Sequence, residues 1–382
     1  MPLRGLQVLE LAGLAPAPFC GMVLSDFGAS VIRMDRLKTK TFHIDRLNRG
    51  KKALAVDYTR ADGRNVFLDL CRNSDVLIDP FRPGVMEAHQ LGPKDIQAVN
   101  ERLIYARLSG YGQEGPMSAK AGHDINFLSL SGVLSKLGPD EHSRPRPPLN
   151  LLADFGGGGL LCAFGILAAV IGRISTAKGQ VVDANITDGT AYLSSWLWRA
   201  QDLPVWGVGR GTSWFDGGLP WYDTYECKDG KYVAVGCLER PFFDQLLTGL
   251  DIAGKYDQST NEEGLRAELE IIFRRRTRDE WAKHFEAFDA CVTPVLTLDE
   301  APNHPHHQSR QCFRSNEDEV LEPLPSPRLS NAEGGTTLDG QKNVKSAVPK
   351  SHGQHTEDIL RGLGYDMQKI NSLRHNNVIG TA

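Results

Sequence analysis

Short apolar runs alternate with segments of helical spacing through the first half of the chain. Strand-like runs lie at residues 6–11, 30–34 and 53–57. Between and after them, residues 18–27 and 61–72 carry apolar side chains every three or four positions, which is typical of helices that bury one face. Strands thus alternate with helices along this stretch. This order predicts a Rossmann-like parallel sheet with helices on both faces.

The alternation continues to about residue 200 and then stops. Residues 203–221 are rich in Gly, Trp and Pro and show no regular period. A hairpin around Asp229-Gly230 follows, with helices expected at 241–250, 262–275 and 278–288, which indicates a smaller α+β domain. In the first half, further strands are expected at 75–78, 102–108 and 181–184, and further helices at 123–137, 155–175 and 189–197.

The 382 residues are too many for one ordinary compact core. We predict a large α/β domain over residues 1–200, a linker over 201–222, and a small α+β domain over 223–318. Residues 319–382 then form a linker and a C-terminal return to the large domain, with the extended Pro323–Pro327 stretch in the linker.

The overall composition is that of a globular protein, with 41% hydrophobic and 24% charged residues. The net charge is −4, from 43 basic and 47 acidic residues, so the chain as a whole does not attract nucleic acid or an anionic membrane. Any anionic ligand must be held by a local basic cluster. Seven scattered cysteines without a C-x-x-C pair indicate reduced thiols in an intracellular protein.

One uncharged run, residues 155–172, approaches the length of a membrane span. It contains six glycines and follows Asp154 directly, so a buried core helix is favoured and no stable membrane insertion is expected. The N-terminus has no secretory pattern, and the last three residues are not a Ser-Lys-Leu-type address. No clear targeting signal is therefore present.

Two glycine-containing turns are candidates for ligand binding. The turn at residues 13–18 is not G-x-G-x-x-G, and its prolines remove backbone N–H groups where a pyrophosphate would bind, which argues against NAD or FAD. Gly156–Gly159 opens a helix after Asp154 and allows either anion binding or close packing. Both interpretations stay open. The loop His304–His307 contains a proline and has no further ligand at metal spacing, so no metal site is expected.

Two polar sets also have two interpretations each. His123 and Asp124 begin an apolar helical pattern and act either as a helix cap or in catalysis. A basic set at predicted strand ends indicates either a phosphorylated ligand or a solvated positive face. Its members are Arg33, Arg36, Arg46, Arg49, Lys51, Lys52 and Arg82.

Several short motifs follow one another in a specific order from Leu3 to the helix near His355. They are Leu11-Ala-Gly-Leu-Ala-Pro-Ala-Pro18, Asp26-Phe-Gly-Ala-Ser-Val-Ile-Arg33, Arg82-Pro-Gly-Val85, Arg102-Leu-Ile-Tyr-Ala-Arg107, Gly122-His-Asp-Ile-Asn126, Pro148-Leu-Asn-Leu-Leu-Ala-Asp-Phe-Gly-Gly157, Asp216-Gly-Gly218, Asp289-Ala-Cys-Val-Thr-Pro-Val295 and His355-Thr356. This ordered set resembles the family III CoA-transferase (CaiB/BaiF) group and, within it, the α-methylacyl-CoA racemases.

The resemblance implies racemisation of 2-methylacyl-CoA thioesters through an enolate. Asp154 matches the carboxylate nucleophile of the transferases, and His123 matches the histidine that the racemases add. Because the planar enolate is reprotonated from either face, two groups are needed, one on each side. Glu239 matches the residue that orients this histidine, and Asp124 matches a further acid beside it.

The resemblance also implies a CoA site and no cofactor other than the CoA of the substrate. Family members often have a basic residue where this chain has Ala88, and Lys where it has Thr59, so Arg49, Lys51 and Arg82 are expected to compensate. The residues implied in substrate and CoA binding are Arg36, Arg49, Val56, Asp57, Tyr58, Thr59, Arg82, Gly122, His123, Asp124, Ile125, Asn126, Phe127 and Tyr222.

The family fold is an interlocked homodimer, so His123 and Asp154 are expected from one subunit and Glu239 from its partner. Peroxisomes or mitochondria are the expected location by resemblance. Two other hypotheses stay open. One is a family III CoA-transferase with Asp154 as nucleophile, and the other is a non-catalytic acyl-CoA-binding protein.

Overall fold

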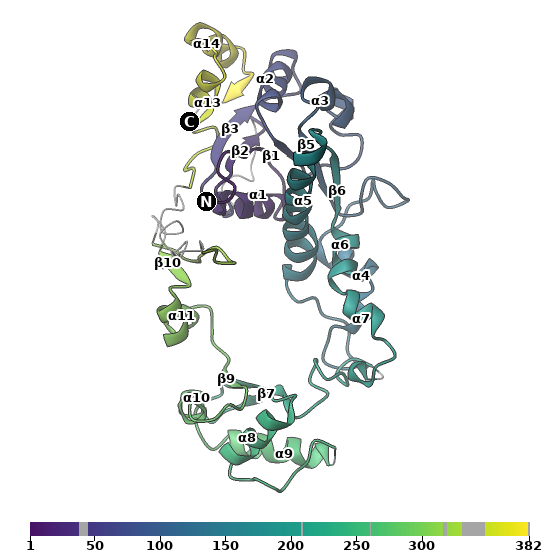
Figure 1. The fold of residues 1–382 in the computed structure, drawn as a ribbon, viewed down its shortest axis with the longest axis vertical. Coiled ribbons are helices and arrows are strands. Elements are labelled where there is room, and N and C mark those ends of the chain that lie inside the picture. Colours follow the sequence, from purple (N-terminus) through teal and green to yellow (C-terminus); the bar gives the residue numbers. More distant parts are fainter. Residues whose placement is uncertain (38–44, 208, 260, 316–318, 331–347, 381–382) are drawn as a thin grey trace. The chain divides into compact units, whose positions relative to one another are not determined.

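The computed structural model describes residues 1–37, 45–207, 209–259, 261–315, 319–330 and 348–380. The chain forms two compact units (Figure 1). The large unit contains Met1–Gly132, Pro148–Ser194 and Arg314–Ala382, and the small unit contains Val133–Pro147 and Ser195–Phe313. The small unit is therefore built from two segments that are inserted at different points of the large one.

A seven-stranded sheet forms the centre of the large unit, in the order β12-β3-β2-β1-β4-β5-β6 (Figure 1). The pairs from β3 to β6 are parallel, whereas β12 pairs antiparallel with β3 at one edge. The order 3-2-1-4-5-6 is the usual one of Rossmann-type sheets, and the predicted fold class is confirmed. The strands are β1 (Gln7–Leu11), β2 (Ser30–Asp35), β3 (Lys52–Val56), β4 (Val76–Asp79), β5 (Ile104–Ser109), β6 (Val181–Asn185) and β12 (Ile379–Gly380).

Helices cover both faces of this sheet. On one face, the core packs side chains such as Phe67, Ile96 and Leu360 against Leu9 and Leu77 of the strands. On the other face, α1 and α5 contact the strands. The helices are α1 (Pro16–Asp26), α2 (Ala61–Arg72), α3 (Pro93–Val99), α4 (Asp124–Leu130), α5 (Leu161–Thr176), α6 (Ile186–Leu193), α13 (Thr356–Gly362) and α14 (Met367–His375). The pattern did not predict α3 and α14, which are only 7 and 9 residues long.

A buried ion pair lies between the sheet and α1. Lys51 Nζ is 2.7 Å from Glu10 Oε2 and donates to Pro18 O at 2.8 Å. Both charged side chains are fully buried. Burial raises the pKa of Glu10 to about 7, against the lowering effect of Lys51. Gly21 on α1 faces the Glu10 carboxylate and leaves room for it.

Two arginines of the predicted basic set are also paired inside the large unit. Arg33 is fully buried and donates to both carboxylate oxygens of Asp35 at 3.0 and 2.9 Å. Arg49 Nε donates to Asp26 Oδ1 at 2.8 Å, and Arg49 Nη1 donates to Pro323 O at 3.0 Å. Together with Lys51, these residues form neither a solvated face nor an open anion site. Arg49 instead attaches the C-terminal return to the large unit.

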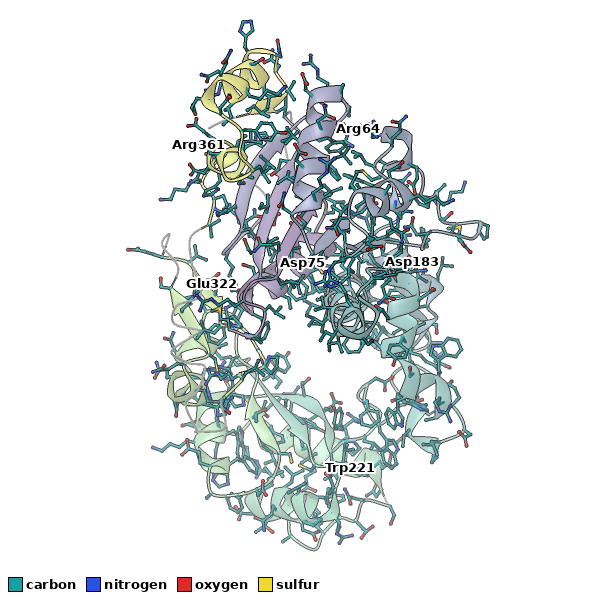
Figure 2. All side chains as sticks on the ribbon, turned by 45° about the horizontal axis from the view of Figure 1, so that its top comes forward. Arg64, Asp75, Asp183, Trp221, Glu322 and Arg361 are labelled. Carbon is teal, nitrogen blue, oxygen red and sulfur yellow. The ribbon has the colours of Figure 1, made fainter. Side chains whose placement is uncertain are left out.

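The small unit has an antiparallel sheet with helices and its own core. Trp221, labelled in Figure 2, packs in this core with Phe243 and Phe273. The predicted hairpin is present, with Tyr222 opposite Gly236. The elements are β7 (Tyr222–Glu226), β8 (Tyr232–Gly236), β9 (Val292–Pro294), α7 (Ser195–Arg199), α8 (Arg240–Gly249), α9 (Glu262–Phe273), α10 (Arg278–Phe285) and α11 (Pro305–Arg310). Two further strands, β10 (Phe313–Ser315) and β11 (Leu321–Pro323), pair with each other outside this sheet.

The boundaries of the units differ from the predicted ones. Residues 133–147 and 195–222 belong to the small unit, not to a large domain of residues 1–200 and a linker. The side chain of Arg210 explains part of this, because it donates to the carbonyl oxygens of Ser135, Asp140 and Glu141 at 3.1–3.2 Å. Such contacts between irregular segments leave no periodic pattern in the sequence.

The apolar segment predicted as residues 155–175 is a continuous helix over Leu151–Thr176. It is long and apolar enough to cross a membrane, and 39% of its most apolar window is buried. The prediction of a buried core helix is therefore wrong for one face, where Phe164 and Ile174 are 66% and 82% exposed. The predicted helix 123–137 ends at Leu130, because Gly132 adopts a positive φ of 81° before the 3₁₀ turn Val133–Lys136.

Replacement of Gly21 by alanine tests the packing of α1 on Glu10. A Cβ at Gly21 would lie 1.7 Å from Glu10 Oε2. We expect Gly21→Ala to lower the free energy of unfolding by about 1–3 kcal/mol, the usual cost of overpacking, as measured by urea denaturation. Gly362→Ala is the control, because no described atom lies within 4 Å of a Cβ on this helical residue. Equal stability of the two variants would contradict the packing.

Candidate active site

A cavity of about 210 Å³ lies at the carboxyl ends of β1, β4 and β5. The sheet order reverses between β1 and β4, and ligands of Rossmann-type folds bind at this reversal. The cavity is mostly apolar, with a few polar groups that face it. Its lining includes Leu14, Pro16, Ala17, Pro80, Arg82, Leu108, Tyr111, Lys120, Gly122, His123, Phe127, Asp154 and Ile186.

Asp154 reaches this cavity from a wide helix whose glycines pack directly on neighbouring backbone. Residues Leu151–Leu160 form a π-helix that continues into α5. A Cβ at Gly157 would lie 2.5 Å from Thr190 Oγ1 of α6, and one at Gly159 would lie 2.6 Å from Pro16 O of α1. Of the two interpretations of Gly156–Gly159, close packing is therefore the one that the structure supports. π-helical turns within α-helices are frequent at functional sites.

His123 precedes α4 and is positioned by aromatic packing. A Cβ at Gly122 would lie 2.6 Å from Tyr111 Oη and 2.7 Å from Phe127 Cε1, so only glycine fits there. The rings of Tyr111 and Phe127 meet edge to face at 5.0 Å. The backbone N–H of His123 donates to Asn126 Oδ1 at 3.1 Å. These contacts fix the backbone at His123, an exposed residue that lines the same cavity as Asp154.

Asp124 connects the two helices and affects the charge of Asp154. Its Oδ1 accepts hydrogen bonds from the backbone N–H groups of Ala153 and Asp154 at 3.1 and 2.8 Å. Its buried Oδ2 has no hydrogen-bond partner among the described residues. Burial, and next the charge of Asp124, raises the pKa of Asp154 to about 6, while Asn150 and His123 lower it. Asp154 is therefore able to release and accept a proton near neutral pH.

Arg36 follows β2, and its side chain is both exposed and held by neighbouring aromatic residues. Its Nε donates to Tyr58 Oη at 3.1 Å. The guanidinium lies 5.6 Å from the ring centre of Tyr58 and 5.4 Å from that of Phe81, while the residue stays exposed. Nearby, Asp57 Oδ1 accepts from both the N–H and the hydroxyl of Thr59. An exposed cation over two rings is suited to a phosphate or a base.

The other predicted residues lie in three different settings. Arg82 is exposed, donates to Ala119 O at 3.2 Å and lines the cavity. Arg49 is turned inward, as described above, so we no longer assign it to CoA. Glu239 and Tyr222 belong to the small unit, where Glu239 precedes α8. Tyr222 borders a separate cavity of about 390 Å³.

The structure adds residues that sequence reasoning did not identify. The side chain of Asn150 forms a hydrogen bond with that of Asp154, and the ring of Phe81 lies against the guanidinium of Arg36. Tyr111 and Lys120 line the cavity. Lys120 lies between two of the motifs, the one at Arg82 and the one at Gly122, and belongs to neither. Its positive charge was the one feature of the sequence that could have marked it as a candidate for anion binding. Ile125 of α4 is 45% exposed, and Val56 is a fully buried residue of β3.

The chain resembles known proteins over nearly its whole length. A sequence model of CoA-transferase family III matches residues 3–356. Alpha-methylacyl-CoA racemase from Homo sapiens is 46% identical over 99% of this chain and 98% of that protein. The enzyme of the same name from Mus musculus is 44% identical with the same coverage. The succinyl-CoA–L-malate CoA-transferase beta subunit from Chloroflexus aurantiacus is 28% identical over 99% of this chain and 98% of that protein.

A solved structure confirms the fold. The crystal structure of a CaiB/BaiF family protein from Brucella suis superposes with a TM-score of 0.78 and covers 95% of this chain and 99% of that one, at 24% identity.

Two substitutions are expected to move the pKa of Asp154 in opposite directions. Asp124→Asn keeps the acceptor for the Ala153 and Asp154 N–H groups but removes the negative charge, so the pKa of Asp154 falls from about 6. Asn150→Ala removes a hydrogen bond to the carboxylate, so this pKa rises. Infrared titration measures the shift, with Asp154→Asn as the spectral reference. One and the same pKa in both variants and the unmodified protein would contradict the assigned causes.

Proposed function

The chain belongs to CoA-transferase family III, and from this membership we propose that it is a racemase of 2-methylacyl-CoA thioesters. It interconverts their (2R) and (2S) forms. The identity to two α-methylacyl-CoA racemases, 46% and 44%, is well above the 28% identity to the malate CoA-transferase subunit. Branched-chain acyl-CoA esters are the proposed substrates, and no cofactor beyond their own CoA takes part.

The observation that carries this proposal is that His123 and Asp154 line one cavity. The proton next to a thioester carbonyl is weakly acidic, and its loss leaves a planar enolate. One of the two groups removes this proton, and the other delivers a proton to the opposite face, which inverts the stereocentre. Each positioned acid or base is typically worth about 10²–10⁴ in rate.

The enolate oxygen is proposed to lie at the start of α4. Backbone N–H groups at a helix N-terminus stabilise developing negative charge. The first such groups here belong to Asp124 and Ile125, directly after His123. The apolar lining from Leu14 and Phe127 supports the proposal, because exclusion of water strengthens these interactions.

CoA is proposed to extend from this cavity toward the ends of β2 and β3. The exposed cations Arg82 and Arg36 support this direction. Arg36 would contact a phosphate or the adenine, and residues 57–59 would lie along the nucleotide. Val56, which was also expected there, is buried within β3 and would not contact CoA with its side chain. The basic residues lost relative to the family pattern at Ala88 and Thr59 are then compensated by Arg82 and Lys120, not by Arg49 or Lys51.

A homodimer completes the proposed enzyme. One face of α5 carries exposed apolar side chains at positions that follow helical spacing, with Phe164 66%, Ile171 67% and Ile174 82% exposed. Apolar patches of this kind mark interaction surfaces. We infer that a second copy covers them, not lipid, because Arg173 on the same helix is ion-paired to Asp75 at 2.9 Å. Glu239 would come from the partner and orient His123.

The compartment stays a prediction. The similarity to enzymes of acyl-CoA metabolism supports an intracellular location, and peroxisomes or mitochondria are the proposed compartments.

Deuterium exchange at C2 tests the racemase. In D₂O, the protein is expected to exchange the C2 proton of both enantiomers of a 2-methylacyl-CoA. We expect His123→Ala to slow exchange from one enantiomer by about 10²–10⁴ and from the other by much less, because each base serves one face. The exposed His142 provides the control variant His142→Ala. An acyl group on Asp154 that hydroxylamine traps would contradict the racemase and favour the transferase, and no exchange above background would favour a binding protein.

Charge on the exposed face of α5 is expected to prevent dimer formation. The double change Phe164→Glu and Ile174→Glu places carboxylates where the second copy would pack, so light scattering after gel filtration should shift from dimer to monomer. Leu298→Glu is the control, because Leu298 is 93% exposed but lies outside α5. A monomeric unmodified protein, or a double variant that stays dimeric, would contradict the proposed surface.

A further inference from the structure

The His355-Thr356 motif has no part in the site described so far, yet it completes the edge of β3. Within residues 348–380, strand β12 pairs with Val56 and Ala55 of that edge. Further along, the N–H of His355 donates to Ala53 O at 2.9 Å, and the N–H of Ala53 donates to His355 Nδ1 at 3.0 Å. One residue thus makes the pair of bonds that an opposite strand residue would make.

The side chain of Thr356 also bonds the open edge of β3, where a neighbouring strand would otherwise pair. The N–H of Ala55 donates to Thr356 Oγ1 at 3.2 Å, and Thr356 is fully buried. Buried backbone N–H groups without partners are costly, so these two side chains stabilise the edge. Because Nδ1 of His355 accepts a hydrogen bond, the ring is neutral and carries its proton on Nε2.

The same C-terminal segment holds the backbone of the proposed CoA residues. His352 Nε2 donates to Arg36 O at 2.7 Å. Val378 O accepts from the N–H of Asp57 at 2.8 Å. Both stretches assigned to the nucleotide half of CoA, the end of β2 and the end of β3, are therefore attached to residues 352–380.

We propose that His355 and Thr356 are positioning residues for the nucleotide half of CoA, and that protonation of His355 weakens CoA binding. The proposal rests on the assignment of CoA to this site. A protonated imidazole has N–H groups on both nitrogens, so Nδ1 no longer accepts from Ala53 and the two N–H groups oppose each other. The beginning of β3 then loses an edge hydrogen bond at Ala53, so the strand that leads into residues 57–59 is held less firmly.

The direction of the pH effect follows from the surroundings of His355. Burial, and next Lys52 on β3, lowers the pKa of His355 from its ordinary 6.5, while Asp358 on α13 acts in the opposite direction. A histidine with a lowered pKa keeps its neutral, bonded form above 6.5 and loses it as the pH falls through the lowered value. Weaker binding is thus confined to acidic pH.

Calorimetric titration of the full-length protein with CoA tests the proposal without turnover. We expect His355→Ala to raise the Kd of CoA about five- to tenfold at pH near 7.5, the effect of one lost hydrogen bond. His355→Asn places an amide oxygen close to the position of Nδ1, accepts the same N–H and does not titrate. Its Kd is expected to match that of the unmodified protein near pH 7.5 and to stay constant toward pH 5.5, where the unmodified protein binds more weakly.

Thr356 provides a second pair of variants that does not depend on His355. Thr356→Ser keeps the hydroxyl and should bind CoA normally, whereas Thr356→Val keeps the shape but loses the acceptor and should bind about five- to tenfold more weakly. In turnover assays, His355→Ala and Thr356→Val should have a higher KM for a 2-methylacyl-CoA than the unmodified protein. Their KM for the same acyl ester of pantetheine should be unchanged, because pantetheine lacks the nucleotide.

Three results would overturn the proposal. They are an unchanged Kd in His355→Ala and Thr356→Val, a failure of His355→Asn to remove the pH dependence, and an equal loss for the CoA and pantetheine esters. Failure of the proposed function gives a different result, since a protein without C2 exchange can still bind CoA with the predicted pattern.

Discussion

Direct packing of glycine backbone around Asp154 is the constraint on which the candidate site depends. Gly157 lies against Thr190 of α6, Gly159 lies against Pro16 of α1, and Gly189 of α6 approaches the carbonyl oxygen of Gly157 in turn. These helices lie far apart in the sequence, and the glycines allow them to pack closely around Asp154. Any side chain here would displace the wide helix, and Asp154 with it. The burial that raises the pKa of this carboxyl is a consequence of the same packing.

Several basic residues of the large unit are paired with buried carboxylates near α1 and are therefore not available to bind a ligand. Lys51 and Arg49 are satisfied by Glu10 and Asp26, and each also binds a backbone carbonyl oxygen. Buried ion pairs contribute little net stability, but loss of one partner is costly, so such pairs specify one arrangement of the chain. Here they attach Pro18 of α1 and Pro323 of the C-terminal return. The members of this basic set that stay exposed are Arg36, Arg46, Lys52 and Arg82. A few separate cations suit one defined anion better than a diffuse field does.

Local patterns predicted the large unit well, because its strands are short apolar runs and its helices have one apolar face. The parallel sheet with helices on both faces follows from this alternation. Long-range pairing was not predictable in the same way. Glu10 and Lys51 are 41 residues apart, and Arg210 meets carbonyl groups 67–75 residues away, so neither contact leaves a periodic signal. His123 and Asp154 were identified through motif resemblance, whereas Asn150 and Phe81 act through contacts that exist only once the chain has folded.

The charge around Asp154 fits a group that must hold a proton in one direction of the reaction and lack it in the other. At neutral pH, a carboxyl with a pKa of about 6 is protonated in roughly one molecule in ten, which is enough for it to act as acid or base. A carboxylate that serves only as a nucleophile gains nothing from the neighbouring negative charge of Asp124, since it attacks in its ionised form. Asp124, buried and with one oxygen unpaired among the described residues, keeps the proton affinity of Asp154 high. This arrangement is costly for folding, and it supports the proposed reversible proton transfer in the cavity that His123 also lines.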